Sequence, residues 1–207
     1  MSEIRIVERD EKIIREVSRW RVILSRHITI LAGFTGQRAC ERRLKKLAEN
    51  GYIQRKRVLY GVPGIYSLAK AGLALIGEKK NSEVRVEQIQ HDIAVLDTAI
   101  YLHRVKGIAF EQMQTEKQLH SIDGFGMRRH RPDIVITREG KAYCVEVELS
   151  LKAKARLEGI IKANFMDYDH QIWIVPDREC RIYQILLDNR RQYTNMSILG
   201  LEEVQKK

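Results

Sequence analysis

The sequence contains few of the residues that organise disulfide frameworks, metal sites or membrane spans. Its 207 residues include three cysteines, Cys40, Cys144 and Cys180, and no two of them form a Cys-x-x-Cys pair. Isolated cysteines of this kind are typical of small buried residues in a reducing cytoplasm, so neither a disulfide framework nor a structural zinc site is expected. No apolar run approaches the length needed to cross a bilayer, and residues 1–12 are charged rather than signal-like. The sequence therefore predicts a cytoplasmic protein with no membrane partner.

Several motifs that carry enzyme chemistry are also missing. The sequence has no glycine-rich loop that would cradle a phosphate, no nucleophile elbow, and no tyrosine–histidine cluster of the kind that nicks DNA. Four of the six histidines, His27, His103, His120 and His170, show no metal-ligand spacing with one another. ATP hydrolysis and tyrosine-mediated nicking are therefore not expected of this chain.

Excess positive charge is confined to the first part of the chain. Residues 1–80 carry 18 Lys/Arg against 8 Asp/Glu, whereas residues 81–207 carry 19 of each, so the whole net charge of +10 belongs to the first part. This asymmetry predicts two regions with different roles, the first of which meets a polyanion. A membrane surface would also attract cations, but here they lie within a helix-and-hairpin pattern rather than on one long amphipathic helix. Nucleic acid is the favoured partner.

The pattern of residues 1–80 predicts a winged helix-turn-helix domain. Apolar spacing predicts three helices, and a fourth follows a β-hairpin whose two runs are rich in β-branched and aromatic residues. Ser25 is placed to cap the second helix, and Gly51 to end the third. The predicted helices and hairpin runs cover residues 7–20, 25–33, 37–50, 52–61, 64–72 and 70–79.

The third predicted helix and the hairpin carry the cations expected to contact DNA. On a helical wheel Cys40, Leu44 and Leu47 share one side of the third helix. The other side of that helix and the hairpin carry Arg38, Arg42, Lys45, Lys46, Arg55, Lys56 and Arg57. In a winged helix the third helix would read the major groove of double-stranded DNA and the hairpin would contact phosphates. The alternatives are a merely solvated helix face and a winged helix that binds protein.

Residues 81–207 predict a second, α/β domain. The expected order is helix, three strands, helix, strand and a further helix, and the tail at 197–204 either adds a strand or stays loose. A Glu-Gly turn joins the second and third strands as a hairpin, and Ser150 is placed to cap the second helix. These elements are expected at residues 83–106, 108–119, 133–138, 141–149, 150–165, 172–175 and 178–190.

Acidic residues gather where the second and third of these strands would lie side by side. Asp133 opens one strand, and Glu146 and Glu148 alternate onto one face of the next. A carboxylate cluster is costly without a cation, so it favours Mg²⁺ or Mn²⁺, with Lys152 or Lys154 over the site. A metal held in this way near a scissile phosphate supports phosphodiester hydrolysis, with Asp133, Glu146, Glu148 and Lys152 as the catalytic candidates.

Two other groups of residues are candidates for a role at the acid cluster, and each could instead have a purely structural role. Arg128, Arg129 and Arg131 precede Asp133 and would hold the DNA backbone near the acids, or would simply be a solvated loop. The adjacent His91 and Asp92 lie on the long helix, where Asp92 would face the acid cluster or only bond to the helix surface.

The segments 90–97, 129–136 and 145–152, behind a winged-helix pattern, resemble the replication-relaxation family of plasmid and mobile-element proteins over about residues 8–178. The second domain also resembles the PD-(D/E)xK nuclease-like fold, with an αβββαβ core. That resemblance makes Pro132-Asp133 the first half of the motif and Glu146 the acid of the second half. Glu148 stands where the pattern has lysine, so Lys152 becomes the candidate for that role. A nuclease-like scaffold that no longer cuts and instead docks protein is the alternative.

The resemblance implies a sequence-specific DNA-binding accessory protein that recognises an origin region in conjugative mobilisation or replication initiation. Its expected partners are double-stranded DNA and a relaxase or replication proteins, and a homodimer would suit palindromic DNA. DNA binding requires no cofactor. Two alternatives remain open: a metal-dependent endonuclease or nickase with Mg²⁺ or Mn²⁺, and a winged-helix transcriptional regulator.

Overall fold

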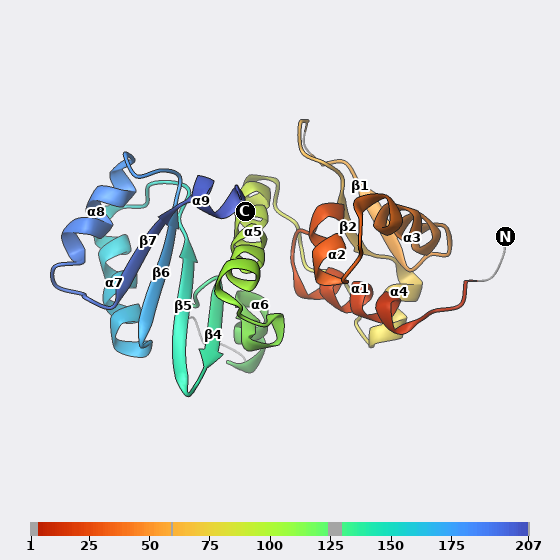
Figure 1. The fold of residues 1–207 in the computed structure, drawn as a ribbon, viewed down its shortest axis with the longest axis horizontal. Helices are drawn as coiled ribbons and strands as arrows, with labels where there is room; N and C mark the ends of the chain where they lie inside the picture. Colours follow the sequence, from red (N-terminus) through yellow and green to blue (C-terminus); the bar gives the residue numbers. More distant parts are fainter. Residues whose placement is uncertain (1–3, 59, 124–129, 207) are drawn as a thin grey trace. The chain divides into compact units, whose positions relative to one another are not determined.

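The computed structural model describes residues 4–58, 60–123 and 130–206, and the chain divides into two compact units, Met1–Leu96 and Asp97–Lys207 (Figure 1). The charge asymmetry of the sequence places a boundary near residue 80, whereas packing places it inside helix α5 (Ile89–Lys106). The reason is that Ile89 is fully buried with Val22, Leu24 and Ile65 in a core cluster of the first unit. Within the described part of the chain, no helix is both long and apolar enough to cross a membrane.

The first unit consists of three helices, a two-stranded hairpin and a closing helix. Its strands pair antiparallel from Ile53 opposite Leu68 to Lys56 opposite Ile65. The backbone N–H of Tyr66 donates to the carbonyl of Ile23 at 3.0 Å, which fixes the segment between the first two helices beside the hairpin. The elements are α1 (Glu8–Arg19), α2 (Ser25–Leu31), α3 (Gln37–Glu49), β1 (Ile53–Lys56), β2 (Ile65–Leu68), α4 (Lys70–Ile76) and the short 3-10 helix η1 (Val86–Gln88).

Helix α3 forms where its apolar spacing predicts it. Cys40, Leu44 and Leu47 are each fully buried, and their spacing of four and three residues keeps them on one face of the helix. The chain leaves the helix through Gly51, whose φ of 74° lies in the left-handed region that favours glycine. One side of α3 is therefore committed to the core and the other is left to solvent.

Helix α4 lies so close to the start of the hairpin that only glycine fits at the contact. A Cβ added at Gly72 would lie 2.1 Å from the carbonyl oxygen of Tyr52. That distance is far below van der Waals contact, so any side chain at this position would push the closing helix away from β1.

A buried ion pair joins α1 to α3. Asp10 is fully buried, and its carboxylate accepts two hydrogen bonds from Arg43, one of them at 2.7 Å from Nε. The Arg43 guanidinium also donates to the carbonyl of Arg5 at 3.0 Å. Arg43 is therefore turned towards the core side of α3, away from the outward-facing cations of the same helix.

The second unit is a five-stranded mixed sheet with helices on both faces. The strand order is β3-β4-β5-β6-β7, in which β3, β4 and β5 pair antiparallel and β5, β6 and β7 pair parallel. Besides α5, its elements are η2 (Phe110–Gln112), β3 (Met113–Thr115), α6 (Glu116–Ile122), β4 (Ile134–Arg138), β5 (Lys141–Val147), α7 (Lys154–Asp167), β6 (His170–Val175), α8 (Arg181–Asn189), β7 (Met196–Gly200) and α9 (Leu201–Gln205).

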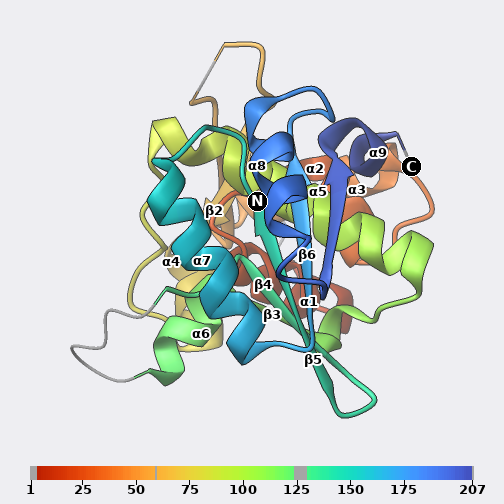
Figure 2. The same ribbon diagram turned by 90° about the vertical axis from the view of Figure 1, so that its left-hand side faces the viewer.

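Helices α7 and α8 cover one face of this sheet, as Figure 2 shows in front of the strands. Their apolar residues pack on the fully buried Trp173 and Val175 of β6 and on Met196 of β7. The C-terminal end of α5 lies on the other face, where Leu102, Ile136 and Ile172 line a common cavity. The fold of the chain is thus mixed α+β, with the helix-rich unit first and the sheet second.

Several of the predicted elements have different bounds. The helix expected at 83–106, for example, begins only at Ile89, after the 3-10 helix η1. The strand expected at 108–119 is wrong for most of its length, because β3 spans only three residues before α6 begins. Thr115 caps α6: its hydroxyl accepts from the N–H of Gln118 at 3.4 Å, and the Gln118 side chain accepts from the N–H of Thr115 at 2.9 Å. The helix expected from Ser150 begins at Lys154 instead, since Glu148 still extends the sheet with an N–H donated to Ile174.

We predict that Arg43→Met lowers the free energy of unfolding by about 3 kcal/mol, because it leaves the charge of Asp10 buried without its partner. Urea denaturation of the full chain measures the loss. The double variant Asp10→Asn, Arg43→Met leaves no buried charge and should recover part of it. A double variant that loses the sum of the two single effects would show that the pair is not coupled.

Candidate nucleic-acid interface and buried carboxylate centre

The outward face of α3 presents cations to solvent. Arg38, Arg42, Lys45 and Lys46 are all exposed, and the first three follow one another at spacings of four and three residues on one side of the helix. Lys45 lies 3.8 Å from Glu49, an exposed ion pair of little energetic weight. The four cationic side chains are therefore available to an external anion.

The N-terminal end of the same face carries a polar network that sequence reasoning missed. The Gln37 amide donates to Ser25 Oγ and to Glu41 Oε1, both at 2.8 Å, and accepts from the Thr29 hydroxyl at 2.8 Å. These bonds join the start of α3 to α2, so the angle between the two helices is held by side chains as well as by the core. The feature of the sequence that could have indicated this network is a glutamine, Gln37, in the first turn of α3, directly before Arg38.

The hairpin adds a second group of cations. Arg55 and Lys56 are exposed at the end of β1, and Arg57 is exposed in the connection that follows. Tyr60, in the same connection, is fully exposed to solvent. A Cβ at Gly64 would lie 2.9 Å from Cγ of Arg55, so the glycine makes room for the arginine stem across the hairpin. The hairpin thus offers three cations and one aromatic ring beyond its paired core.

The predicted acids Asp133 and Glu146 come together in the second unit. Ile134 of β4 lies opposite Val145 of β5, which brings the neighbouring Asp133 and Glu146 to adjacent positions at one end of the pair. Asp133 Oδ2 accepts from the backbone N–H of Val147 at 2.7 Å, which fixes its side chain against β5. Glu146 is 6% exposed, so its carboxylate is removed from water.

Two residues that sequence reasoning missed hold the Glu146 carboxylate. His130 Nε2 lies 2.7 Å from Glu146 Oε1, and the Asn164 amide of α7 donates to the same oxygen at 2.8 Å. His130 stands only three residues before Asp133, and Asn164 interrupts the buried apolar positions of α7 that include Leu157 and Ile161. A single amide on an apolar helix face is a signal for a buried polar partner.

The pKa values of both members of this pair are raised, for different reasons. Burial raises the pKa of Glu146, the nearby Asp133 charge raises it further, and the bonds from His130 and Asn164 oppose both effects. The bond to Glu146 raises the pKa of His130, although desolvation and the charge of Lys152 act against that rise. Both shifts favour a proton shared by the imidazole and the carboxylate.

Glu148 and Lys152 form an ion pair of their own. Lys152 Nζ lies 2.5 Å from Glu148 Oε2, and the lysine side chain is 32% exposed while Glu148 is buried. Lys152 is thus already paired with the acid that stands where the nuclease pattern has lysine. Lys154, the other lysine expected over the site, instead lies 3.7 Å from Glu158 of its own helix, so it is not part of the centre.

These contacts bear on whether a divalent cation fits the acids. Glu146 is engaged by His130 and Asn164, Glu148 by Lys152, and one oxygen of Asp133 by a backbone N–H. Across the described ranges, no three His, Cys, Asp or Glu side chains are grouped so as to hold a metal ion. As arranged, the donor set does not fit a three-ligand centre.

The remaining candidates have other partners or lie outside the described residues. Arg131 donates to Asp123, the residue that follows α6, through Nε at 2.7 Å and through a second nitrogen, so it has a partner within the protein. Arg128 and Arg129 lie outside the described residues. Asp92 pairs with Arg21 at 3.2 Å and His91 at 3.5 Å, all within the first unit.

Comparison with known families gives a match over most of the chain. The model of the family described as Replication-relaxation matches residues 14–169, a stretch that includes α3, the hairpin and all the acids of the centre. No curated protein matches the chain.

We predict that Glu146→Gln moves the pKa of His130 down towards the ordinary histidine value of 6.5, because the bond and the charge that raise it are lost. A smaller decrease is expected for Asp133→Asn, which removes only a charge. An NMR titration of the imidazole measures both, and Glu158→Gln on the surface of α7 is the control.

The raised pKa of His130 also makes the stability of the fold depend on pH. Since folding raises the pKa of His130, its protonation adds to the free energy of unfolding. This contribution is complete at a pH below the ordinary histidine pKa and is lost as the pH rises through the pKa of the folded state. An imidazole titration that does not change in Glu146→Gln would contradict the assignment of the proton to this pair.

Proposed function

This chain belongs to the replication-relaxation family, and from that membership we propose that it binds double-stranded DNA in the replication or mobilisation of a plasmid or integrative mobile element. In this proposal the first unit is a winged helix-turn-helix that recognises an origin region. The second unit is a nuclease-like scaffold that positions other proteins of the process, a relaxase or replication proteins.

The observation that carries the proposal is the one-sided charge of α3. Its inner side is buried through Cys40, Leu44 and Leu47, and the cation that would disturb that side, Arg43, is bound by Asp10. The outer side keeps Arg38, Arg42, Lys45 and Lys46 in solvent. A helix with this division supports entry into a major groove, where arginine can pair with the O6 and N7 atoms of guanine.

The hairpin supports the same assignment by its position after α3. In winged helices the strand connection reaches the sugar–phosphate backbone beside the recognition helix, and Arg55, Lys56 and Arg57 supply the charge for such contacts. Because phosphate contacts release counterions, each of these residues would contribute to affinity in a salt-dependent way without reading sequence.

The second unit supports an accessory role more than a cutting role. With α6 set aside, the order α5, β3, β4, β5, α7, β6 is that expected of a nuclease-like αβββαβ core, but the acids are held by His130, Asn164 and Lys152. One observation favours the endonuclease as a second candidate: Asp133 and Glu146 lie close enough for the charge of one to raise the pKa of the other. Cleavage would require these contacts to open and Mg²⁺ or Mn²⁺ to bind.

We predict that the α3 and hairpin cations affect DNA binding differently. A selection from a random duplex library first identifies a preferred site, and fluorescence anisotropy then compares that duplex with an unrelated one. Arg42→Ala should weaken binding to the preferred duplex by roughly tenfold and to the unrelated one much less, as expected for a base contact. The triple variant Arg55→Ala, Lys56→Ala, Arg57→Ala should weaken both equally.

The salt dependence separates the two roles further. Each lost phosphate contact should reduce the slope of log affinity against log salt concentration by about one. Lys154→Ala, an exposed lysine of α7, is the matched control and should change neither affinity nor slope. If the library yields no preferred site, or if Lys154→Ala weakens binding as much as Arg42→Ala does, the proposed recognition helix is wrong.

We further predict that the purified chain does not nick supercoiled plasmid in Mg²⁺ or Mn²⁺, because the acids are occupied by protein donors and cations. Agarose electrophoresis of the plasmid over time measures this directly. Nicking that is present in the wild type and lost in Asp133→Ala, Glu146→Ala would establish the endonuclease instead.

A further inference from the structure

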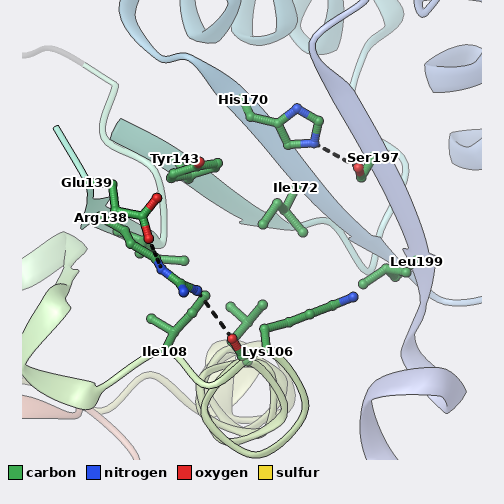
Figure 3. Close-up of a pocket in the computed structure, with 11 residues that line it drawn as sticks. Lys106, Ile108, Arg138, Glu139, Tyr143, His170, Ile172, Ser197 and Leu199 are labelled. Carbon is green, nitrogen blue, oxygen red and sulfur yellow. Dashed lines mark hydrogen bonds and ion pairs between the residues drawn. The ribbon is translucent and has the colours of Figure 1, made fainter. Parts of the chain in front are cut away.

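A cavity of about 380 Å³ lies on the sheet face opposite α7 and α8, where the C-terminal end of α5 approaches the strands (Figure 3). Its volume falls within the range of pockets that bind small molecules. All of its lining residues belong to the second unit. Its apolar wall comes from α5, the segment after it and three strands, and consists of Leu102, Ile108, Ile136, Ile172 and Leu199.

Polar groups surround this apolar wall. His170 Nε2 and Ser197 Oγ lie 2.7 Å apart on neighbouring strands, and the ring of Tyr143 lies 6.3 Å from that of His170 (Figure 3). Burial and the charge of Arg190 lower the pKa of His170, so its imidazole is neutral at physiological pH and serves as a hydrogen-bonding group. The tyrosine, histidine and serine thus offer neutral polar contacts at one side of the cavity.

Among the charged residues that line the cavity, Lys106 is available to bind an anion. Arg138 donates to the Glu139 carboxylate at 3.3 Å and to the carbonyl of Lys106 at 3.4 Å, so its side chain already has partners within the protein. Lys106 is exposed, and among the residues that the structure describes its ammonium group forms no ion pair. In Figure 3 its side chain extends along the cavity towards Leu199.

This cavity is separate from the carboxylate centre although both include residues of β5. Successive side chains of a strand point to opposite faces, so Tyr143 lines the cavity while Glu146 contacts Asn164 of α7 on the other face. A substitution in the cavity can therefore be made without touching the acids.

We propose that this cavity binds a small organic anion with an aromatic or aliphatic body. The body packs between Leu102, Ile136 and Ile172, and the acidic group lies beside the Lys106 ammonium. The hydroxyl and imidazole groups of Tyr143, His170 and Ser197 give the site hydrogen bonds that a purely apolar cleft would lack. The inference does not depend on DNA binding, because no residue of the cavity belongs to the first unit.

The test compares two probes of equal shape and different charge, 2-naphthoate and 2-naphthamide, titrated into the full-length protein and followed by NMR. Both should shift the resonances of His170 and Ser197, and the anion should bind roughly fivefold more tightly, as expected for one partly exposed charge pair. Lys106→Met should abolish that preference while leaving the binding of the amide unchanged. Lys154→Met, on the opposite side of the sheet, should preserve the preference.

A second variant tests the cavity itself. Leu199→Trp fills the apolar side and should weaken both probes at least tenfold, with the fold checked by the unchanged amide spectrum of the α7 and α8 core. Equal affinity for the two probes in the wild type would overturn the proposal. So would binding without shifts at His170 and Ser197, or loss of the anion preference in Lys154→Met.

Discussion

A carboxylate placed inside a packed sheet must be hydrogen-bonded, and this constraint organises the second unit around Glu146. Its oxygen is shared by His130, which precedes β4, and by Asn164 of α7. The segment before β4, the central strand β5 and the helix that covers them are therefore joined by one side chain. Asp133 joins the same group by accepting from the backbone of β5, which ties the start of β4 to the end of its neighbour.

The first unit also contains a buried charge, and there an ion pair between two helices neutralises it. Helix α3 carries five cations besides its apolar residues, and a cation on the core side would weaken the packing. Arg43 is the one that faces inward, and the fully buried Asp10 neutralises it. The remaining four are left to solvent, so the division between core and surface along α3 is complete. The same pair also fixes α1 against α3, so stability and the outward charge have a common origin.

Local signals predicted the helices and hairpins, but not the contacts that join them. The apolar spacing of Cys40, Leu44 and Leu47 and the position of Gly51 were sufficient for α3. The hairpin turn at Glu139-Gly140 was also predictable from the sequence. Both residues have positive φ, as a tight two-residue hairpin turn requires. The strand expected at 108–119 was wrong because a capping box at Thr115 overrides its β-like composition.

Long-range partners were beyond such reasoning for a physical reason. The bonds between Arg43 and Asp10, and between His130 and Glu146, depend on tertiary packing and have no periodicity of their own. The adjacency of Asp133 and Glu146 was predictable because antiparallel pairing forces it, whereas their partners on the preceding segment and on α7 were not. The cavity beside α5 is equally invisible in a sequence, since it arises where several side chains fail to meet.

The brevity of β3 has a consequence for how this protein behaves at high concentration. The strand at the border of a sheet has unpaired backbone groups to which another polypeptide chain can add a strand. The risk of such pairing grows with the length of that strand. Here one border is only Met113–Thr115, after which Thr115 turns the chain into α6. The opposite border, β7, runs from Met196 to Gly200 before α9 begins. Any growth of the sheet between molecules, whether orderly or as aggregation, would therefore start at β7.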